Sequence, residues 1–177
     1  RKPTPDGEKN ESSGTESSTE SDAAQEVQKT YAAARQALQQ GSATKAIRLF
    51  QRVRILCGAG APAQAQCASL SGSVALGLAS LYEKDNSLPE AMQEYEKAMH
   101  ISGPGKLTSA QRSEAQKAVV RLMFKLGKVI ITTPKPGGCK QESLWVLASV
   151  RTQVKVGNIY QPVQVAAGST TKIGACP

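Results

Sequence analysis

The sequence predicts an α+β fold, in which amphipathic helices precede a small antiparallel, sandwich-like β domain. From residue 23 to residue 127 apolar residues recur every three or four positions, and Ala, Leu, Gln, Glu and Lys are frequent, as in amphipathic helices. From residue 128 to the end, short β-branched runs often alternate with polar residues, a pattern typical of strands. Residues 1–22 contain no Val, Ile, Leu, Met or aromatic residue. Such a segment has nothing to bury, so we expect a disordered linker.

Composition excludes several classes of protein. The chain has 177 residues, a formal net charge of +8 and a single histidine, His100. A Ser-His-Asp hydrolase or a histidine-rich metal site would therefore depend on His100 alone. No apolar run approaches the roughly 20 residues of a transmembrane helix. A linker at the N-terminus is consistent equally with a tether to a membrane anchor that precedes this sequence and with an inert terminus.

The helices are delimited by turn-forming residues. Breaks at 40–42, 57–67, 85–87 and 103–105 predict helices over 23–40, 43–56, 65–84, 88–101 and 108–126. Ser87 or Asn86 can cap the fourth helix, which has Pro89 in its first turn. Thr108 can cap the fifth.

The strands are short and separated by Gly and Pro. We expect them at 128–133, 144–147, 152–156, 162–165 and 170–173, with turns at 134–138, 157–158 and 167–169. A domain of about fifty residues has a marginal core and benefits from a covalent cross-link.

The four cysteines divide into two local pairs. Cys57 and Cys67 bracket a loop of small residues, whereas Cys139 follows a Pro-Gly-Gly turn and Cys176 is penultimate. The spacing fits no zinc motif. Two disulfides, Cys57–Cys67 and Cys139–Cys176, would indicate an exported protein. The alternative is four reduced thiols in a cytosolic protein.

The second and fourth helices are alike in sequence. Ala46, Phe50 and Val53 align with Ala91, Tyr95 and Ala98 at an offset of 45 residues. With Leu78, Ala79 and Tyr82 ahead of the later copy, the region resembles the tetratricopeptide (TPR) repeat. A standard repeat has about 34 residues, so about 11 remain, and the loop between Cys57 and Cys67 accommodates them.

The resemblance implies two helix pairs and a capping fifth helix. It also implies that the repeat residues pack in the core, while residues on the concave side bind a partner's peptide. On this basis Gln36, Gln39, Gln40, Glu83 and Lys84 are the candidate partner-binding residues.

The C-terminal region resembles the PEGA-type module, a small β-sandwich of bacterial surface proteins. Thr132-Thr133-Pro134 and Val163-Gln-Val-Ala-Ala-Gly168 carry this resemblance. TPR helices and such modules occur together in the bacterial envelope, which implies a periplasmic or outer-membrane-associated location, with a lipid anchor ahead of the present sequence as one way of attachment.

The sequence carries no catalytic, cofactor-binding or metal-binding motif. Leu107 follows Gly105-Lys106 where a phosphate-binding loop needs Ser or Thr. No Gly-x-Ser-x-Gly elbow is present. We therefore expect a protein that is not an enzyme.

Two functional hypotheses follow. The first is a protein-interaction adaptor in an envelope assembly such as a motility, pilus or secretion apparatus. The second is a module that binds a polyanion, namely peptidoglycan, lipopolysaccharide or nucleic acid, through the basic β domain. A solvated basic face is the alternative to both, and few aromatic residues and no recognition motif argue against nucleic acid. The basic candidates are Lys128, Lys135, Lys140, Arg151, Lys155 and Lys172.

Overall fold

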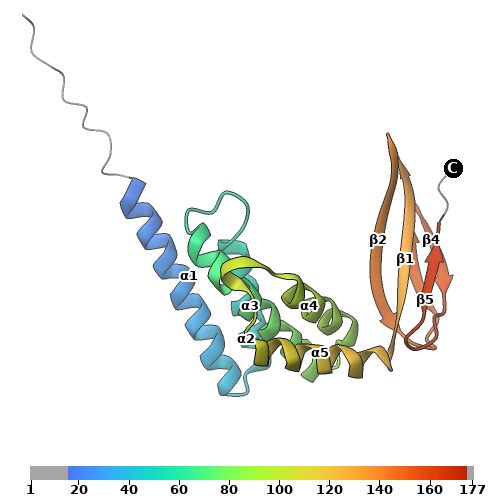
Figure 1. The fold of residues 1–177 in the computed structure, drawn as a ribbon, viewed down its shortest axis with the longest axis horizontal. Coiled ribbons are helices and arrows are strands. Elements are labelled where there is room, and N and C mark those ends of the chain that lie inside the picture. Colours follow the sequence, from blue (N-terminus) through green and yellow to red (C-terminus); the bar gives the residue numbers. More distant parts are fainter. Residues whose placement is uncertain (1–15, 175–177) are drawn as a thin grey trace, which may run out of the picture.

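The computed structural model describes residues 16–174, which form five α-helices followed by five strands (Figure 1). The helices form one end of the molecule and the strands stand at the other end. This order confirms the predicted α+β fold class. The helices are α1 (Glu16–Gln39), α2 (Ala43–Leu56), α3 (Gln64–Lys84), α4 (Leu88–His100) and α5 (Ser109–Met123), with a 3-10 turn η1 (Gly103–Gly105) before α5.

The first helix begins earlier than the sequence predicted. The expected linker ended at residue 22, but α1 starts at Glu16, so residues 16–22 are helical, while 1–15 lie outside the described residues. Adding residues to a formed helix costs little once its nucleus exists. Val27 anchors this part of α1, because its side chain is buried against the core.

The helices pack as two pairs, α1 with α2 and α3 with α4, and α5 packs on α4. Of the residues that carry the TPR resemblance, Tyr82 is only partly buried, whereas the others are buried as predicted: Ala46, Phe50, Val53, Leu78, Ala79, Ala91, Tyr95 and Ala98. Phe50 meets Tyr31 edge-on, with ring centroids 6.0 Å apart. As predicted, Thr108 caps the N-terminus of α5 with its side chain, and it forms a capping box with Gln111.

The long connection between α2 and α3 is closed by a disulfide. Cys57 and Cys67 are bonded, with their Cα atoms 5.4 Å apart, which confirms this predicted pair. The second predicted pair includes Cys176, which lies outside the described residues.

The strands form two small sheets. β1 (Leu126–Lys135) pairs antiparallel with β2 (Gly138–Leu147), and β3 (Thr152–Val156) pairs antiparallel with β4 (Ile159–Val163). The turn between β1 and β2 is shorter than expected, because Pro134 and Gly138 are already paired in the strands. β5 (Thr170–Ile173) runs parallel to β1, so the expectation of a purely antiparallel domain was wrong for this strand. Valines from β1 to β4, together with Ile131 and Val165, fill a core of this β region.

The helices and strands share a core. The predicted division at 127–128 falls inside β1, and Leu126 and Trp145 belong to the hydrophobic cluster of α4 and α5. The Trp145 indole N–H donates to Glu96 Oε2 on α4 at 2.9 Å. Lys128 Nζ lies 3.5 Å from Glu96 Oε1 and 5.1 Å from the centre of the indole ring. The β region is therefore docked on the helices through a specific polar and apolar junction.

Candidate functional site

Two hollows lie on opposite sides of α3. We call the first the inner groove, which is bounded by α1, α3 and α5 and has a volume of about 570 Å³. Its side chains recur at helical spacing on each of these helices, so each helix turns one stripe toward the hollow. The lining comprises Tyr31, Arg35, Leu38, Phe50, Ser73, Leu76, Gly77, Ser80, Tyr95, Gln111, Glu114, Ala115, Lys117, Ala118 and Arg121.

The inner groove has an apolar floor and a charged rim. Phe50, Tyr95 and Leu76 belong to or pack against the cores beneath it, whereas Arg35 and Lys117 are exposed. A concave surface of this kind excludes water from an apolar ligand group and orients it by charge. The inner groove is therefore suited to hold a side chain of a peptide.

Beneath the groove, Glu83 links three helices. The Tyr95 hydroxyl donates to Glu83 Oε2 at 3.0 Å, and Arg121 donates to Glu83 Oε1 from Nε at 3.0 Å and from a terminal nitrogen at 2.6 Å. Burial raises the pKa of the Tyr95 phenol well above its ordinary value, and the hydrogen bond to Glu83 raises this pKa further. Tyr95 is thus a neutral hydrogen-bond donor that holds α4 to α3.

The predicted partner-binding residues do not line the groove. Gln36, Gln39 and Gln40 are exposed near the end of α1, and Lys84 is exposed at the end of α3. Glu83 is occupied by the internal hydrogen bonds described above. The sequence analysis did not identify the residues of α1 that line the groove. In a repeat arrangement, however, one face of the first helix of each pair lies on the concave side, and this signal could have pointed to them.

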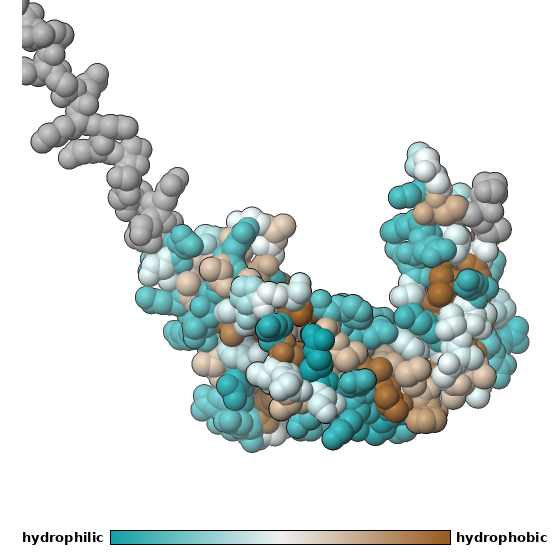
Figure 2. All heavy atoms as spheres, viewed as in Figure 1, coloured by the Kyte–Doolittle hydropathy of each residue, from teal (hydrophilic) through white to brown (hydrophobic). Residues whose placement is uncertain are grey.

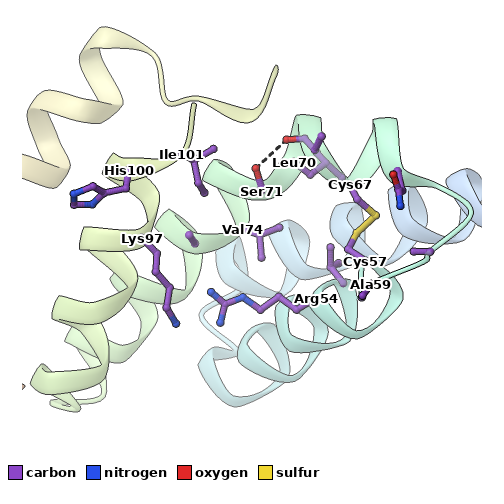
Figure 3. A pocket seen from close by; sticks show the side chains of 16 residues that line it. Arg54, Cys57, Ala59, Cys67, Leu70, Ser71, Val74, Lys97, His100 and Ile101 are labelled. Atoms are coloured by element: carbon purple, nitrogen blue, oxygen red, sulfur yellow. Dashed lines mark hydrogen bonds between the residues drawn. A yellow bond between two sulfur atoms is a disulfide. The ribbon is translucent and has the colours of Figure 1, made fainter. Parts of the chain in front are cut away.

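We call the second hollow the loop pocket. It has a volume of about 760 Å³ and lies between α2, α3 and α4, beside the disulfide-closed loop (Figure 3). Most of its lining is apolar. The lining comprises Val53, Arg54, Cys57, Gly58, Ala59, Ala61, Gln64, Cys67, Ala68, Leu70, Ser71, Val74, Ala75, Lys97, His100 and Ile101.

The charged residues of the loop pocket converge on a buried carboxylate. Arg54 donates to Glu94 Oε1 at 3.0 Å and also contacts Oε2, and Lys97 Nζ lies 2.8 Å from Oε1. Glu94 is only 4% exposed, whereas the side chains of Arg54 and Lys97 are 39% and 54% exposed. Two cationic side chains thus contact one carboxylate, and both are accessible to solvent.

The basic residues of the β region are dispersed. Lys128 is engaged by Glu96 and Trp145, and Lys140 pairs with Glu142 at 2.6 Å. The remaining basic candidates, which are all exposed, are Lys135, Arg151, Lys155 and Lys172. Lys140 and Lys155 line a shared hollow between the two sheets, together with Glu142.

Figure 2 shows a mostly hydrophilic surface over the helices, interrupted by apolar patches, with the β region rising at the far end. Within residues 16–174, no helix has the length and apolarity needed to cross a bilayer. The same residues bring together no group of three or more His, Cys, Asp or Glu side chains suited to hold a metal ion.

No protein-family model, curated protein or solved structure matches this chain.

Proposed function

We propose that the protein is a non-catalytic adaptor that binds a peptide segment of a partner protein in the inner groove. The observation that carries this proposal is the groove itself, which has an apolar floor that includes Phe50, Leu76 and Tyr95 and a charged rim on α1 and α5. Extended or helical peptides are commonly held by such a surface, because apolar anchors enter the hollow and rim charges set orientation.

The burial of the repeat residues supports a TPR-like interpretation of the helices. Small residues such as Ala46 and Ala91 are fully buried where paired helices approach, and the aromatic residues of both copies occupy the core. In such an arrangement the first helix of each pair lines the inner face. Most groove residues lie on α1, α3 and α5, while Phe50 of α2 and Tyr95 of α4 contribute to the floor.

The disulfide supports an oxidising compartment. Cys57 and Cys67 are bonded in a small-residue loop, and such bonds persist in exported proteins. With the resemblance of the β region to envelope modules, we place the adaptor in the bacterial periplasm or at the outer membrane. There it would join components of a motility, pilus or secretion assembly, with the β region contacting a second component.

A displayed peptide library tests the proposal even though the partner is unidentified. Sequences enriched on the wild-type protein are synthesised, and their affinities for Ser73→Trp and Ser69→Trp are compared. Ser73 lines the inner groove, so an indole there fills it and should weaken binding at least about tenfold. Ser69 is exposed on the same helix and outside the groove, so its variant should bind as the wild type does. If no selected peptide binds the wild type more tightly than it binds Ser73→Trp, the proposal is contradicted.

The alternative function, polyanion binding by the basic β region, is distinguished by salt. A polyanion complex releases counterions, so its affinity falls steeply as salt rises, whereas a peptide in an apolar groove loses much less. The measurement is the affinity for a selected peptide and for a lipopolysaccharide or peptidoglycan fragment at low and moderate salt. The alternative would be favoured if affinity for the fragment falls steeply with salt and if Lys155→Gln and Lys172→Gln bind the fragment more weakly than the wild type does.

A further inference from the structure

The loop pocket lies on the other side of α3 from the inner groove, and the adaptor function does not use it. Its apolar wall is made by Val74 and Leu70 of α3, by Ile101 after α4 and by the Cys57–Cys67 disulfide (Figure 3). Its volume of about 760 Å³ falls within the usual range of small-molecule sites. The disulfide-closed loop, which is longer than a standard repeat requires, supplies one side of this hollow.

The charge of the pocket has one sign. Among the described residues, its only ionisable lining side chains, apart from the bonded cysteines, are Arg54, Lys97 and His100, and no Asp or Glu lines it. Arg54 and Lys97 point toward one another across the space between α2 and α4, away from the disulfide (Figure 3). Glu94 behind them balances one of the two permanent cations. An excess positive charge therefore remains at one side of an apolar hollow.

We propose that the loop pocket binds a single-chain anionic amphiphile, of which a long-chain carboxylate is the simplest. The alkyl chain lies against α3 and the disulfide-closed loop, and the anionic head meets Arg54 and Lys97. Charge-assisted hydrogen bonds to a carboxylate are stronger than neutral ones, and burial of the chain supplies the apolar part of the affinity.

An amphiphile fits this wall better than a peptide does. A peptide carries an N–H and a C=O at nearly every residue, and burying them unpaired is costly. The pocket offers few polar partners away from the cations, because the Ser71 hydroxyl already donates to the Ala68 carbonyl at 2.9 Å and Gln64 is exposed at the edge. An alkyl chain has no polar group to satisfy.

Calorimetry and NMR with dodecanoate below its micelle concentration test the proposal. We expect one dodecanoate per chain, and much weaker binding of dodecyltrimethylammonium, which has the same chain and the opposite charge. His100 is the single histidine of the chain and lines the pocket, so its ring signals report the location of binding. They should shift with dodecanoate and not with acetate.

Variants separate this pocket from other surfaces. Ala68→Trp fills the pocket from an exposed position on α3 and should weaken dodecanoate binding at least about tenfold, whereas Ser69→Trp, one residue along and outside the lining, should not. Lys97→Gln should weaken binding by about tenfold through loss of a charge-assisted hydrogen bond, and Lys84→Gln is its exposed control.

Each result decides for or against the proposal. Equal binding of the cationic amphiphile, unshifted His100 signals, or full affinity in Ala68→Trp would overturn it. Because Ser73→Trp blocks the inner groove and leaves the loop pocket open, dodecanoate should bind this variant normally. Failure of peptide binding and failure of dodecanoate binding are therefore independent outcomes.

Discussion

At the scale of single residues, two acidic side chains connect neighbouring helices. Glu83 on α3 accepts hydrogen bonds from Tyr95 and Arg121, and Glu94 on α4 accepts them from Arg54 of α2 and from Lys97. Glu94 is almost fully buried, so its charge is stable there only because both cations face it. The two carboxylates therefore connect helices that bound the inner groove and the loop pocket.

Tyr95 makes the stability of the folded protein depend on pH in the alkaline range. Burial and the bond to Glu83 raise the pKa of Tyr95 in the folded protein, whereas the unfolded chain loses this proton near pH 10. Above that pH the unfolded state binds fewer protons than the folded state, so the free energy of unfolding falls as pH rises. Tyr95→Phe should lack this slope, and at neutral pH it should lose about 1 kcal/mol with the hydrogen bond.

Urea unfolding between about pH 8 and about pH 11 measures this effect. Tyr160→Phe is the matched control, because Tyr160 is 64% exposed, and it should retain the slope of the wild type. Equal slopes for Tyr95→Phe and the wild type would contradict the assignment.

At the scale of elements, the disulfide restrains the loop between α2 and α3. The bond spans a sequence separation of 10 residues, and closing such a loop in the unfolded chain is worth about 3 kcal/mol in the chain-entropy model. The double variant Cys57→Ser/Cys67→Ser should lose about this much stability in urea unfolding. The double variant leaves Cys139 intact, so its effect belongs to this loop alone. An unchanged midpoint would show that the loop contributes nothing through its cross-link.

The elements themselves were largely predictable, because core residues set their periodicity. α2 was predicted with its observed bounds, since its apolar stripe and its flanking Gly residues mark both ends. The start of α1 was not, because its first residues are polar in sequence and carry no apolar signal. The parallel pairing of β5 with β1 was missed for a related reason, since alternation fixes which face a strand buries but not its direction.

The site was less predictable than the elements. Sequence periodicity identifies the buried stripe of a helix, but the exposed stripe that faces a groove depends on how the helices cross. Gln36 and Gln39 are exposed, yet Arg35 and Leu38, which adjoin them in sequence, line the inner groove. The loop pocket likewise requires Lys97 of α4 and Arg54 of α2 to converge on Glu94, and the contact between Arg54 and Glu94 spans 40 positions of sequence.

On the scale of the whole molecule, the helices and strands should unfold as one unit. Trp145 of β2 is 8% exposed within the helical cluster, and its indole donates to Glu96 of α4. It is also the only tryptophan, so its fluorescence reports this junction while circular dichroism reports the helices. Because the junction residues are shared, both signals should change at the same urea concentration.

Glu96→Gln tests whether the junction transmits stability between the two parts. The variant loses the Lys128 ion pair and weakens the bond from Trp145, so the free energy of unfolding should fall by about 1 kcal/mol. Both the fluorescence and the dichroism midpoints should shift together, whereas Glu20→Gln, which removes an exposed carboxylate of α1 far from the junction, should shift neither. A fluorescence midpoint that moves alone would mean that the β region unfolds separately.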